Sequence, residues 1–261
     1  NDGDNALTGG GGADTLSGAE GNDTLYSGDG NDTVDGGAGS DLIVGGNGAG
    51  NDLYRGGAGV DTIRYSSATA GIVVNLDTGT AGSTTGADAG IGRDRLSGIE
   101  NVIGGRFNDV LTGNGSANQL TADAGRDRLE GLAGADRLIG GAGADSLIGG
   151  TGKDRLTGDA GADVFIFDKT SETGATSTKR DVITDFQQGD DLIDLSGIDA
   201  NTNVRGNQGF SFIGADGFSG AAGQLRFAGG IASGDVNGDR VADFTIAVTG
   251  LRSMTEGDFV L

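Results

Sequence analysis

The chain has 261 residues, of which 38 are acidic, 17 are basic and 56 are glycine, and its formal net charge is −21. It contains no cysteine, histidine, proline or tryptophan, which excludes disulfides, thiolate chemistry, histidine-based catalytic triads and histidine zinc sites. The acidity argues against nucleic acid as a partner, and no run is long and apolar enough to predict membrane insertion.

A nine-residue phrase repeats along residues 5–63. It consists of a glycine-rich turn, an aspartate, a spacer and an aliphatic residue, and residues 36–44 (GGAGSDLIV) show it in full. Every step is nine residues except one of eleven, where Ala49 and Gly50 are inserted. The sixth position of the phrase is occupied by Asn5, Asp14, Asp23, Asp32, Asp41, Asp52 and Asp61. We predict a first repeat block over residues 1–64.

The repeat lapses over residues 65–108. Residues 72–76 (IVVNL) have the composition of a strand, and residues 77–92 that of a polar loop. We expect this segment to continue the repeat architecture with wider coils. Its acidic side chains form no recognisable acid/base pair, so a structural role is favoured over a catalytic one. These acidic residues are Asp77, Asp88, Asp94 and Glu100.

The phrase returns over residues 109–165 and predicts a second block, residues 109–167. Its sixth positions are Asp109, Asn118, Asp127, Asp136, Asp145, Asp154 and Asp163. Asn5 and Asn118 lack a charge, and Phe107 replaces a turn glycine before Asp109. We therefore expect some turns to be incomplete as ligand sites.

Elementary physics connects this phrase to a metal. Glycine permits positive φ and close approach of backbone carbonyls. A turn plus a short strand places consecutive strands on opposite sides of a flattened right-handed coil, so residues eighteen apart stack. Stacked carboxylates repel by roughly 1 kcal/mol per close pair even in water. A hard cation with oxygen ligands removes this repulsion, and Ca²⁺ suits such a site. The alternative is a metal-free solenoid whose turns only cap the strands.

The candidate Ca²⁺ ligands are the aspartates of both blocks and the turn glycines, which offer carbonyl oxygens. Asp181 joins the aspartates because it lies eighteen residues beyond Asp163. The aspartates are Asp14, Asp23, Asp32, Asp41, Asp52, Asp61, Asp109, Asp127, Asp136, Asp145, Asp154, Asp163 and Asp181. The glycines are Gly10, Gly12, Gly21, Gly28, Gly30, Gly37, Gly39, Gly46, Gly57, Gly59, Gly125, Gly134, Gly141, Gly143, Gly150, Gly152 and Gly161.

Residues 168–261 have a different composition, with alternating strands and most of the phenylalanines. We expect them to form a β-rich cap on the open end of the solenoid. Asp168 and Glu172 are weaker metal candidates. A loop has the side-chain spacing of a Ca²⁺ loop, with its candidate ligands at Asp235, Asn237, Asp239 and Asp243. Arg240 occupies the usual glycine position, so a polar hairpin is favoured.

Arg128, Arg137 and Arg155 share the spacer position after the aspartate. Arg137 and Arg155 are eighteen residues apart and should stack on one outer face. A groove for an anionic polysaccharide is one interpretation, and charge compensation on an acidic surface is the favoured one.

The phrase resembles the Ca²⁺-binding nonapeptide of RTX parallel β-roll proteins. Residues 99–104 (IENVIG) are similar to the point where inserts rejoin the roll in mannuronan epimerase modules. The last hundred residues resemble the C-terminal domain of serralysin-type secreted proteases, through residues 181–186 (DVITDF), 191–196 (DLIDLS), 242–246 (ADFTI) and the terminus 258–261 (DFVL). That terminus is similar to an uncleaved export signal, and it could equally be a packed final strand.

These resemblances imply an all-β fold, a right-handed parallel β-roll in two blocks with a C-terminal β-rich cap. They imply a secreted, extracellular, non-catalytic module that binds several Ca²⁺ ions, folds on binding them and engages a type I secretion exporter. They leave room for an upstream catalytic domain in a larger protein. The alternative function is a polysaccharide or cell-surface binding module attached to a secreted enzyme.

Overall fold

The computed structural model describes residues 2–45, 48, 50–86 and 89–261. Apart from one 3₁₀ turn, every regular element in this part of the chain is a β-strand. The chain divides into two compact units, Asn1–Leu129 and Glu130–Leu261.

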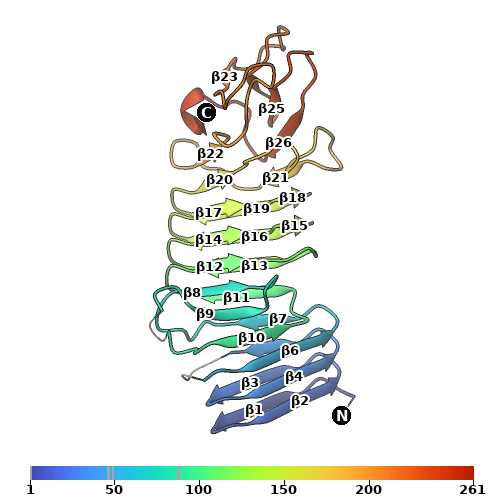
Figure 1. The fold of residues 1–261 in the computed structure, drawn as a ribbon, viewed down its shortest axis with the longest axis vertical. Coiled ribbons are helices and arrows are strands. Elements are labelled where there is room, and N and C mark those ends of the chain that lie inside the picture. Colours follow the sequence, from blue (N-terminus) through green and yellow to red (C-terminus); the bar gives the residue numbers. More distant parts are fainter. Residues whose placement is uncertain (1, 46–47, 49, 87–88) are drawn as a thin grey trace. The chain divides into compact units, whose positions relative to one another are not determined.

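The first unit contains two sheets of short strands, shown in blue to green in Figure 1. One sheet is parallel throughout. In spatial order its strands are β1 (Ala6–Gly11), β3 (Thr24–Asp29), β5 (Leu42–Val44), β7 (Thr62–Arg64), β11 (Asn101–Gly105) and β13 (Gln119–Asp123). The other runs β2 (Thr15–Glu20), β4 (Thr33–Ala38), β6 (Leu53–Ala58), β10 (Asp94–Ser97), β9 (Thr80–Ser83), β8 (Ile72–Asn75) and β12 (Val110–Thr112), and β14 (Arg128–Glu130) lies where the unit ends.

The aliphatic residue of each phrase forms the core, as its spacing predicts. Leu25 on β3 pairs with Ile43 on β5, and Ile43 pairs with Ile63 on β7. All three side chains are fully buried. No strand of three to six residues can bury such a side chain alone, so each coil depends on its neighbours for a core. Burial of each Leu or Ile contributes roughly 1.5 to 3 kcal/mol relative to exposure.

Part of the segment that interrupts the repeat forms a β-strand where a loop was expected. β7 pairs directly with β11, so the first sheet continues through it in parallel. In the other sheet, β9 pairs antiparallel with both β8 and β10. The expected polar loop at residues 77–92 therefore contains a strand. Buried Ala81 and a tight turn at Gly79, whose φ is +65°, let this polar segment fold back on β8.

The second unit begins with parallel strands and ends with an antiparallel meander. One sheet contains β16 (Arg137–Ala142), β19 (Arg155–Ala160), β21 (Asp181–Ile183), β26 (Phe244–Val248), β25 (Ile231–Asp235), β24 (Gln224–Ala228) and β23 (Ser211–Phe212). The other contains β17 (Ser146–Ile148), β20 (Val164–Ile166), β22 (Leu192–Asp194) and β27 (Phe259–Val260). β15 (Ala133–Gly134) pairs with β18 (Thr151–Gly152), and the 3₁₀ turn η1 (Glu256–Asp258) precedes β27.

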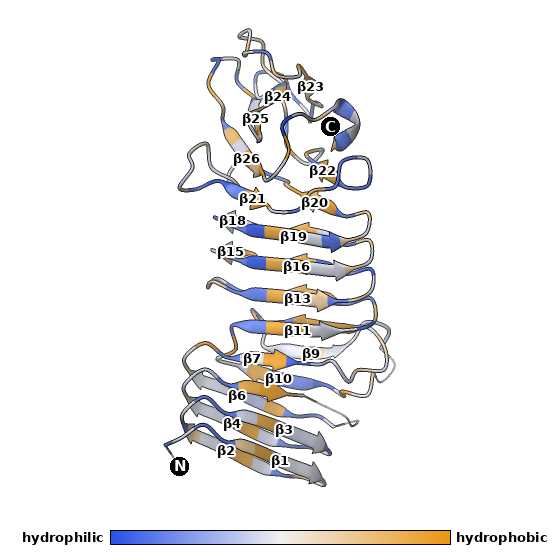
Figure 2. Ribbon diagram, turned by 180° about the vertical axis from the view of Figure 1, so that it is seen from behind, coloured by the Kyte–Doolittle hydropathy of each residue, from blue (hydrophilic) through white to orange (hydrophobic). Residues whose placement is uncertain are grey.

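Aromatic side chains build the core of the later part of the second unit. The ring centroids of Phe210 and Phe244 are 5.7 Å apart, and those of Phe212 and Phe259 are 5.4 Å apart. Figure 2 shows hydrophobic residues recurring along these strands. β25 lies between β24 and β26 and is antiparallel to both, and β26 lies parallel to β21. The meander thus covers the edge strand of the parallel sheet within this unit, as expected of a cap.

The expected all-β fold of a parallel β-roll is confirmed by these sheets. No helix in the described residues has the length and apolarity to span a bilayer. β25 was not predicted, because its sequence of small residues (IASGD) lacks the alternation that marked its neighbours.

Candidate metal sites in the turns

The sixth-position aspartates lie at the ends of turns, directly before the strands. In most of them the backbone N–H donates to a carboxylate oxygen of the next residue in the same column, at 2.6 to 3.0 Å. Asp23 bonds to Asp41 in this way, and Asp14 to Asp32. In the first unit one column contains Asn5, Asp23, Asp41 and Asp61, and the other Asp14, Asp32, Asp52 and Asp94.

Three carboxylates continue the columns although the sequence did not assign them to a metal. The N–H of Asp61 donates to Glu100 Oε2 at 2.8 Å, and that of Asp163 to Asp191 Oδ1 at 2.9 Å. Asp94 follows Asp52, 42 residues later. A detectable signal was present, because each is the first residue of the same acid, spacer, apolar triad as in the repeats (DRL, ENV and DLI). The nine-residue period does not predict them, because their spacing from the repeat aspartates is irregular.

The position of Asp181 differs from the expectation. Its Oδ1 accepts the N–H of Asp154, 27 residues earlier, at 2.7 Å. Asp163, which was expected to stack with it, pairs with Asp191 instead. The reason is that the coil between β20 and β21 is longer than a repeat, which moves Asp181 to the other column. The expected stacking of Asp136 with Asp154 and of Asp145 with Asp163 is confirmed.

The second carboxylate oxygen gives the strongest indication of a ligand. Among the described residues, a set of Oδ2 atoms in these columns is buried without a hydrogen-bond partner. Leaving a buried charged acceptor unsatisfied costs more than the ~1–3 kcal/mol of a neutral group. These atoms belong to Asp14, Asp23, Asp32, Asp41, Asp61, Asp154, Asp163 and Asp181.

Backbone carbonyls border the same space. A Cβ added to Gly18 would meet both the Asp23 Oδ2 atom and the carbonyl oxygen of Gly36, one coil further on. The same arrangement recurs at Gly36, with Asp41 Oδ2 and the Gly56 carbonyl. Only a residue without a side chain leaves this space open. The donor set of carboxylate and carbonyl oxygens fits a hard cation such as Ca²⁺.

The turn glycines have the backbone conformation that the repeat predicts. Gly37 has a φ of +107° and Gly39 a φ of +139°. A Cβ on Gly37 would collide with the Ala19 carbonyl of the preceding coil. Every candidate glycine in the described part of the chain has positive φ, and Gly46 lies outside the described residues.

Burial raises the pKa of these carboxyl groups. Desolvation raises the pKa of Asp61 and Asp154 to about 6, that of Asp163 to about 7 and that of Asp181 to about 8. Neighbouring carboxylates raise the pKa of Asp61, Asp163 and Asp181 further. The protein alone therefore stabilises the negative charges poorly, which is the electrostatic setting in which a bound cation contributes most.

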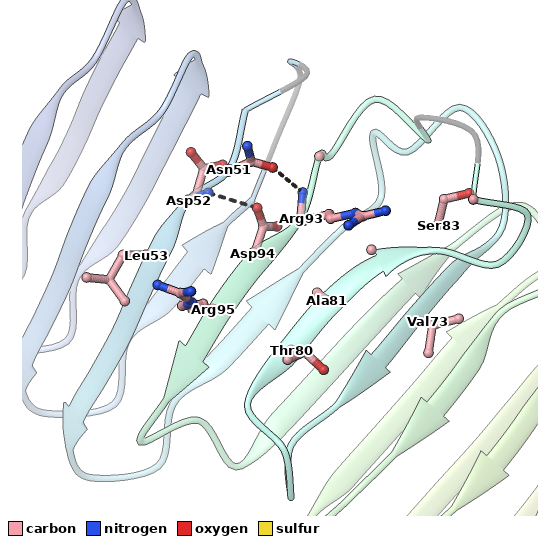
Figure 3. A pocket seen from close by; sticks show the side chains of 13 residues that line it. Asn51, Asp52, Leu53, Val73, Thr80, Ala81, Ser83, Arg93, Asp94 and Arg95 are labelled. Carbon is pink, nitrogen blue, oxygen red and sulfur yellow. Dashed lines mark hydrogen bonds between the residues drawn. The ribbon is translucent and has the colours of Figure 1, made fainter.

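Two candidates have both oxygens bonded within the protein. Asp109 accepts N–H groups from Ile72 at 2.9 Å and Gly105 at 2.8 Å. Asp52 Oδ1 accepts the Asp32 N–H, and its Oδ2 accepts the Tyr54 hydroxyl at 2.7 Å. Figure 3 marks the hydrogen bond that the backbone N–H of Asp52 donates to Asp94 Oδ1. These two turns differ from turns such as that of Asp41, whose Oδ2 atom has no hydrogen-bond partner.

The remaining acidic residues offer less. Nowhere in the described residues do three or more acidic side chains gather in an arrangement that could hold a metal, so any site in the turns relies on carbonyl ligands as well. In the loop after β25, Asp235 is buried and accepts the N–H groups of Gly238 and Arg240. Glu172 Oε2 accepts the Asp168 N–H. Asp88 lies outside the described residues, and Asp77 is exposed in the turn that follows β8.

Family profiles match both regions of the chain. The profile described as Peptidase M10 serralysin C terminal matches residues 55–261, a longer stretch than the last hundred residues that carry the sequence resemblance. The RTX calcium-binding nonapeptide repeat profile (4 copies) matches residues 1–34, 17–49 and 26–63. No curated protein matches the chain.

Two solved structures are similar. The AlgE6R3 subunit of the Azotobacter vinelandii mannuronan C5-epimerase has 24% identity and a TM-score of 0.30, covering 59% of this chain and 78% of its own. The extracellular lipase LipA from Serratia marcescens has 17% identity and a TM-score of 0.34, covering 100% of this chain and 39% of its own. Both scores are low, so the fold rests on the strand pairing described above.

Proposed function

Because the chain belongs to the peptidase M10 serralysin C-terminal family, we propose that it is a non-catalytic, secreted module that binds several Ca²⁺ ions. The ions would lie in the turns, held by the column aspartates and by carbonyls of the turn glycines. The chain would fold on binding them outside the cell. Its C-terminus would be read by a type I secretion exporter.

One observation carries this proposal, the columns of buried aspartates whose Oδ2 atoms face backbone carbonyls. Asp41 shows the complete pattern: its Oδ1 accepts the Asp23 N–H, while its Oδ2 has no hydrogen-bond partner and lies against Gly36. A metal-free solenoid would leave such oxygens unsatisfied in column after column. The RTX profile over residues 1–63 supports the same ligand.

The net charge explains why the ion would act as a folding switch. With 38 acidic and 17 basic side chains and 56 glycines, the metal-free chain combines self-repulsion with a high entropy of the unfolded state. Each ion that binds only the folded chain adds RT ln(1 + [Ca²⁺]/Kd) to the free energy of unfolding. Sites of the extracellular class, with Kd of order 10⁻⁴ to 10⁻³ M, would remain empty in the cytosol.

Circular dichroism of the full chain tests this function. In millimolar Ca²⁺ we expect a β-sheet spectrum, and in excess chelator a largely disordered one that recovers when Ca²⁺ is restored. An equal concentration of Mg²⁺, which demands a stricter octahedral site, should restore much less. An identical β-sheet spectrum in chelator and in Ca²⁺ would rule the proposal out.

The export signal is proposed for residues 258–261. In the folded chain this segment is also structural, because β27 pairs with β22 and buries Phe259. The two roles are compatible if the signal is read before folding. Deleting the last four residues should abolish export from a host carrying a type I exporter, whereas Phe212→Ala, which weakens packing against Phe259 but lies outside the signal, should still be exported. Undiminished export of the truncated chain would contradict the signal.

A second candidate function is binding of an anionic polysaccharide. Arg137 on β16 and Arg155 on β19 are register partners, so the two arginines lie side by side on neighbouring strands. Titration of the Ca²⁺-loaded chain with a polyuronate should then give saturable binding that Arg137→Gln with Arg155→Gln removes. Equal binding by that double variant would leave charge compensation as their role.

A further inference from the structure

The first unit buries two tyrosines beside its carboxylate columns. The chain has three tyrosines and no tryptophan. Tyr54 and Tyr65 are fully buried, whereas Tyr26 is 44% exposed. Tyr54 occupies the aliphatic position of the Asp52 phrase and is the register partner of Val34. An aromatic alcohol in this position is unexpected, because the neighbouring coils have a purely apolar side chain there.

Both hydroxyl groups donate to column aspartates. The Tyr54 hydroxyl donates to Asp52 Oδ2 at 2.7 Å, and the Tyr65 hydroxyl to Asp94 Oδ2 at 2.9 Å. Ser27 Oγ lies 3.0 Å from the Tyr54 hydroxyl and can donate to it. Because the Oδ1 atoms of both aspartates accept backbone N–H groups, all four carboxylate oxygens are bonded. Asp41, in the other column, has an Oδ2 without such a donor.

The ring of Tyr65 also fills the space beside the turn glycine, which stays open in other coils. Gly45 holds the first position of the Asp52 phrase, as Gly36 does for Asp41. A Cβ on Gly36 would meet the Asp41 Oδ2 atom and a carbonyl oxygen, whereas a Cβ on Gly45 would meet Tyr65 Cε1 at 2.8 Å and Cδ1 at 3.2 Å. At this coil an aromatic edge therefore replaces the oxygen-lined space. Burial raises the pKa of both tyrosines well above the ordinary value, so both remain protonated donors at neutral pH.

We propose that Tyr54 and Tyr65 substitute for calcium at Asp52 and Asp94, so that this step of the roll is held by hydroxyl groups and binds no ion. The inference rests on the proposed calcium function of the other turns. It removes Asp52 from the candidate Ca²⁺ ligands. The column then consists of ion-binding turns around Asp14 and Asp32, followed by a metal-free step at Asp52 and Asp94. The repeat sequence alone treats Asp52 like every other aspartate.

Counting bound ions tests this directly. Native mass spectrometry of the full chain in saturating Ca²⁺ gives the wild-type number, and Asp41→Asn and Asp52→Asn form a matched pair. We expect Asp52→Asn to keep the wild-type number and Asp41→Asn to lose at least one ion. Loss of an ion from Asp52→Asn equal to that from Asp41→Asn would overturn the inference. A wild-type chain that binds no Ca²⁺ would instead refute the proposed function itself.

Removing the hydroxyl groups gives a second measurement. Tyr54→Phe and Tyr65→Phe keep the ring but leave a buried carboxylate oxygen without its donor. We expect each to lower the urea midpoint by the same amount at two saturating Ca²⁺ concentrations, with the ion count unchanged. Tyr26→Phe, at an exposed site, should cause no shift. If Tyr54→Phe has both the urea midpoint and the ion count of the wild type in Ca²⁺, the hydroxyl does not replace a metal, whereas a gained ion would show Ca²⁺ occupying the place of the missing hydroxyl.

Discussion

At the scale of single residues, the turns differ in whether glycine occupies the position that requires a positive φ. The second turn position requires positive φ, and Ala19, Asp123, Leu132 and Asp159 adopt it without being glycine, with φ between 64° and 82°. A left-handed conformation costs a residue with a side chain roughly 1 kcal/mol. These turns therefore store strain that the glycine-bearing turns do not.

Ala19→Gly should stabilise the chain. Ala19 has a φ of 82° and an exposed side chain, so the change relieves strain without loss of packing. We expect the free energy of unfolding in Ca²⁺ to rise by about 0.5 to 1 kcal/mol. The control is Ala38→Gly, exposed on β4 without positive φ, which should lower stability by a similar amount. Urea denaturation compares them, and a loss of stability in both variants would contradict the role of φ.

Alkaline pH should destabilise the chain through its buried tyrosines. Burial raises the pKa of Tyr54 and Tyr65 in the folded state above the unfolded value of about 10. A raised folded pKa gives stability that is fully present below pH ~10 and is lost as the pH rises above it. Absorbance at the phenolate band should show these two groups ionising only together with unfolding. Their ionisation while the β-sheet spectrum persists would show that they are accessible.

At the scale of elements, the repeat spacing predicted the strands well wherever it was regular. β3, β5 and β7 place Leu25, Ile43 and Ile63 in one buried row, as their period required. The misses are β9 and β25, whose residues are small and polar. Such segments form strands only because a neighbouring strand supplies partners for their backbone groups, and a sequence pattern does not contain that information.

The final strand should contribute to folding as well as to any export signal. Phe259 is 7% exposed and its ring lies 5.4 Å from that of Phe212. Phe259→Ala should therefore lower the free energy of unfolding by about 3 kcal/mol. Val260→Ala, at a side chain that is 37% exposed, is the control and should cost well under half of that. Equal small losses in thermal denaturation would indicate that β27 is not packed in solution.

At the scale of the whole molecule, a net charge of −21 makes stability a function of bound cations. For each site that is above its Kd, a tenfold rise in Ca²⁺ should add about 1.4 kcal/mol to the free energy of unfolding. Several sites acting together give a steep dependence. Urea midpoints across a Ca²⁺ series at constant ionic strength measure the slope. A slope no greater than that of matched NaCl would mean that the ions only screen charge.

The sequence alone determined the repeat, the apolar core row and most of the candidate aspartates, because a nine-residue period encodes turn, acid and strand in one short phrase. Only the tertiary structure decided which carboxylates share a column where the period fails. Long coils place Asp94, Glu100 and Asp191 in the columns and move Asp181 from one column to the other. It also decided that Asp52 is held by Tyr54, because a hydroxyl group reaches a carboxylate through space and not through spacing.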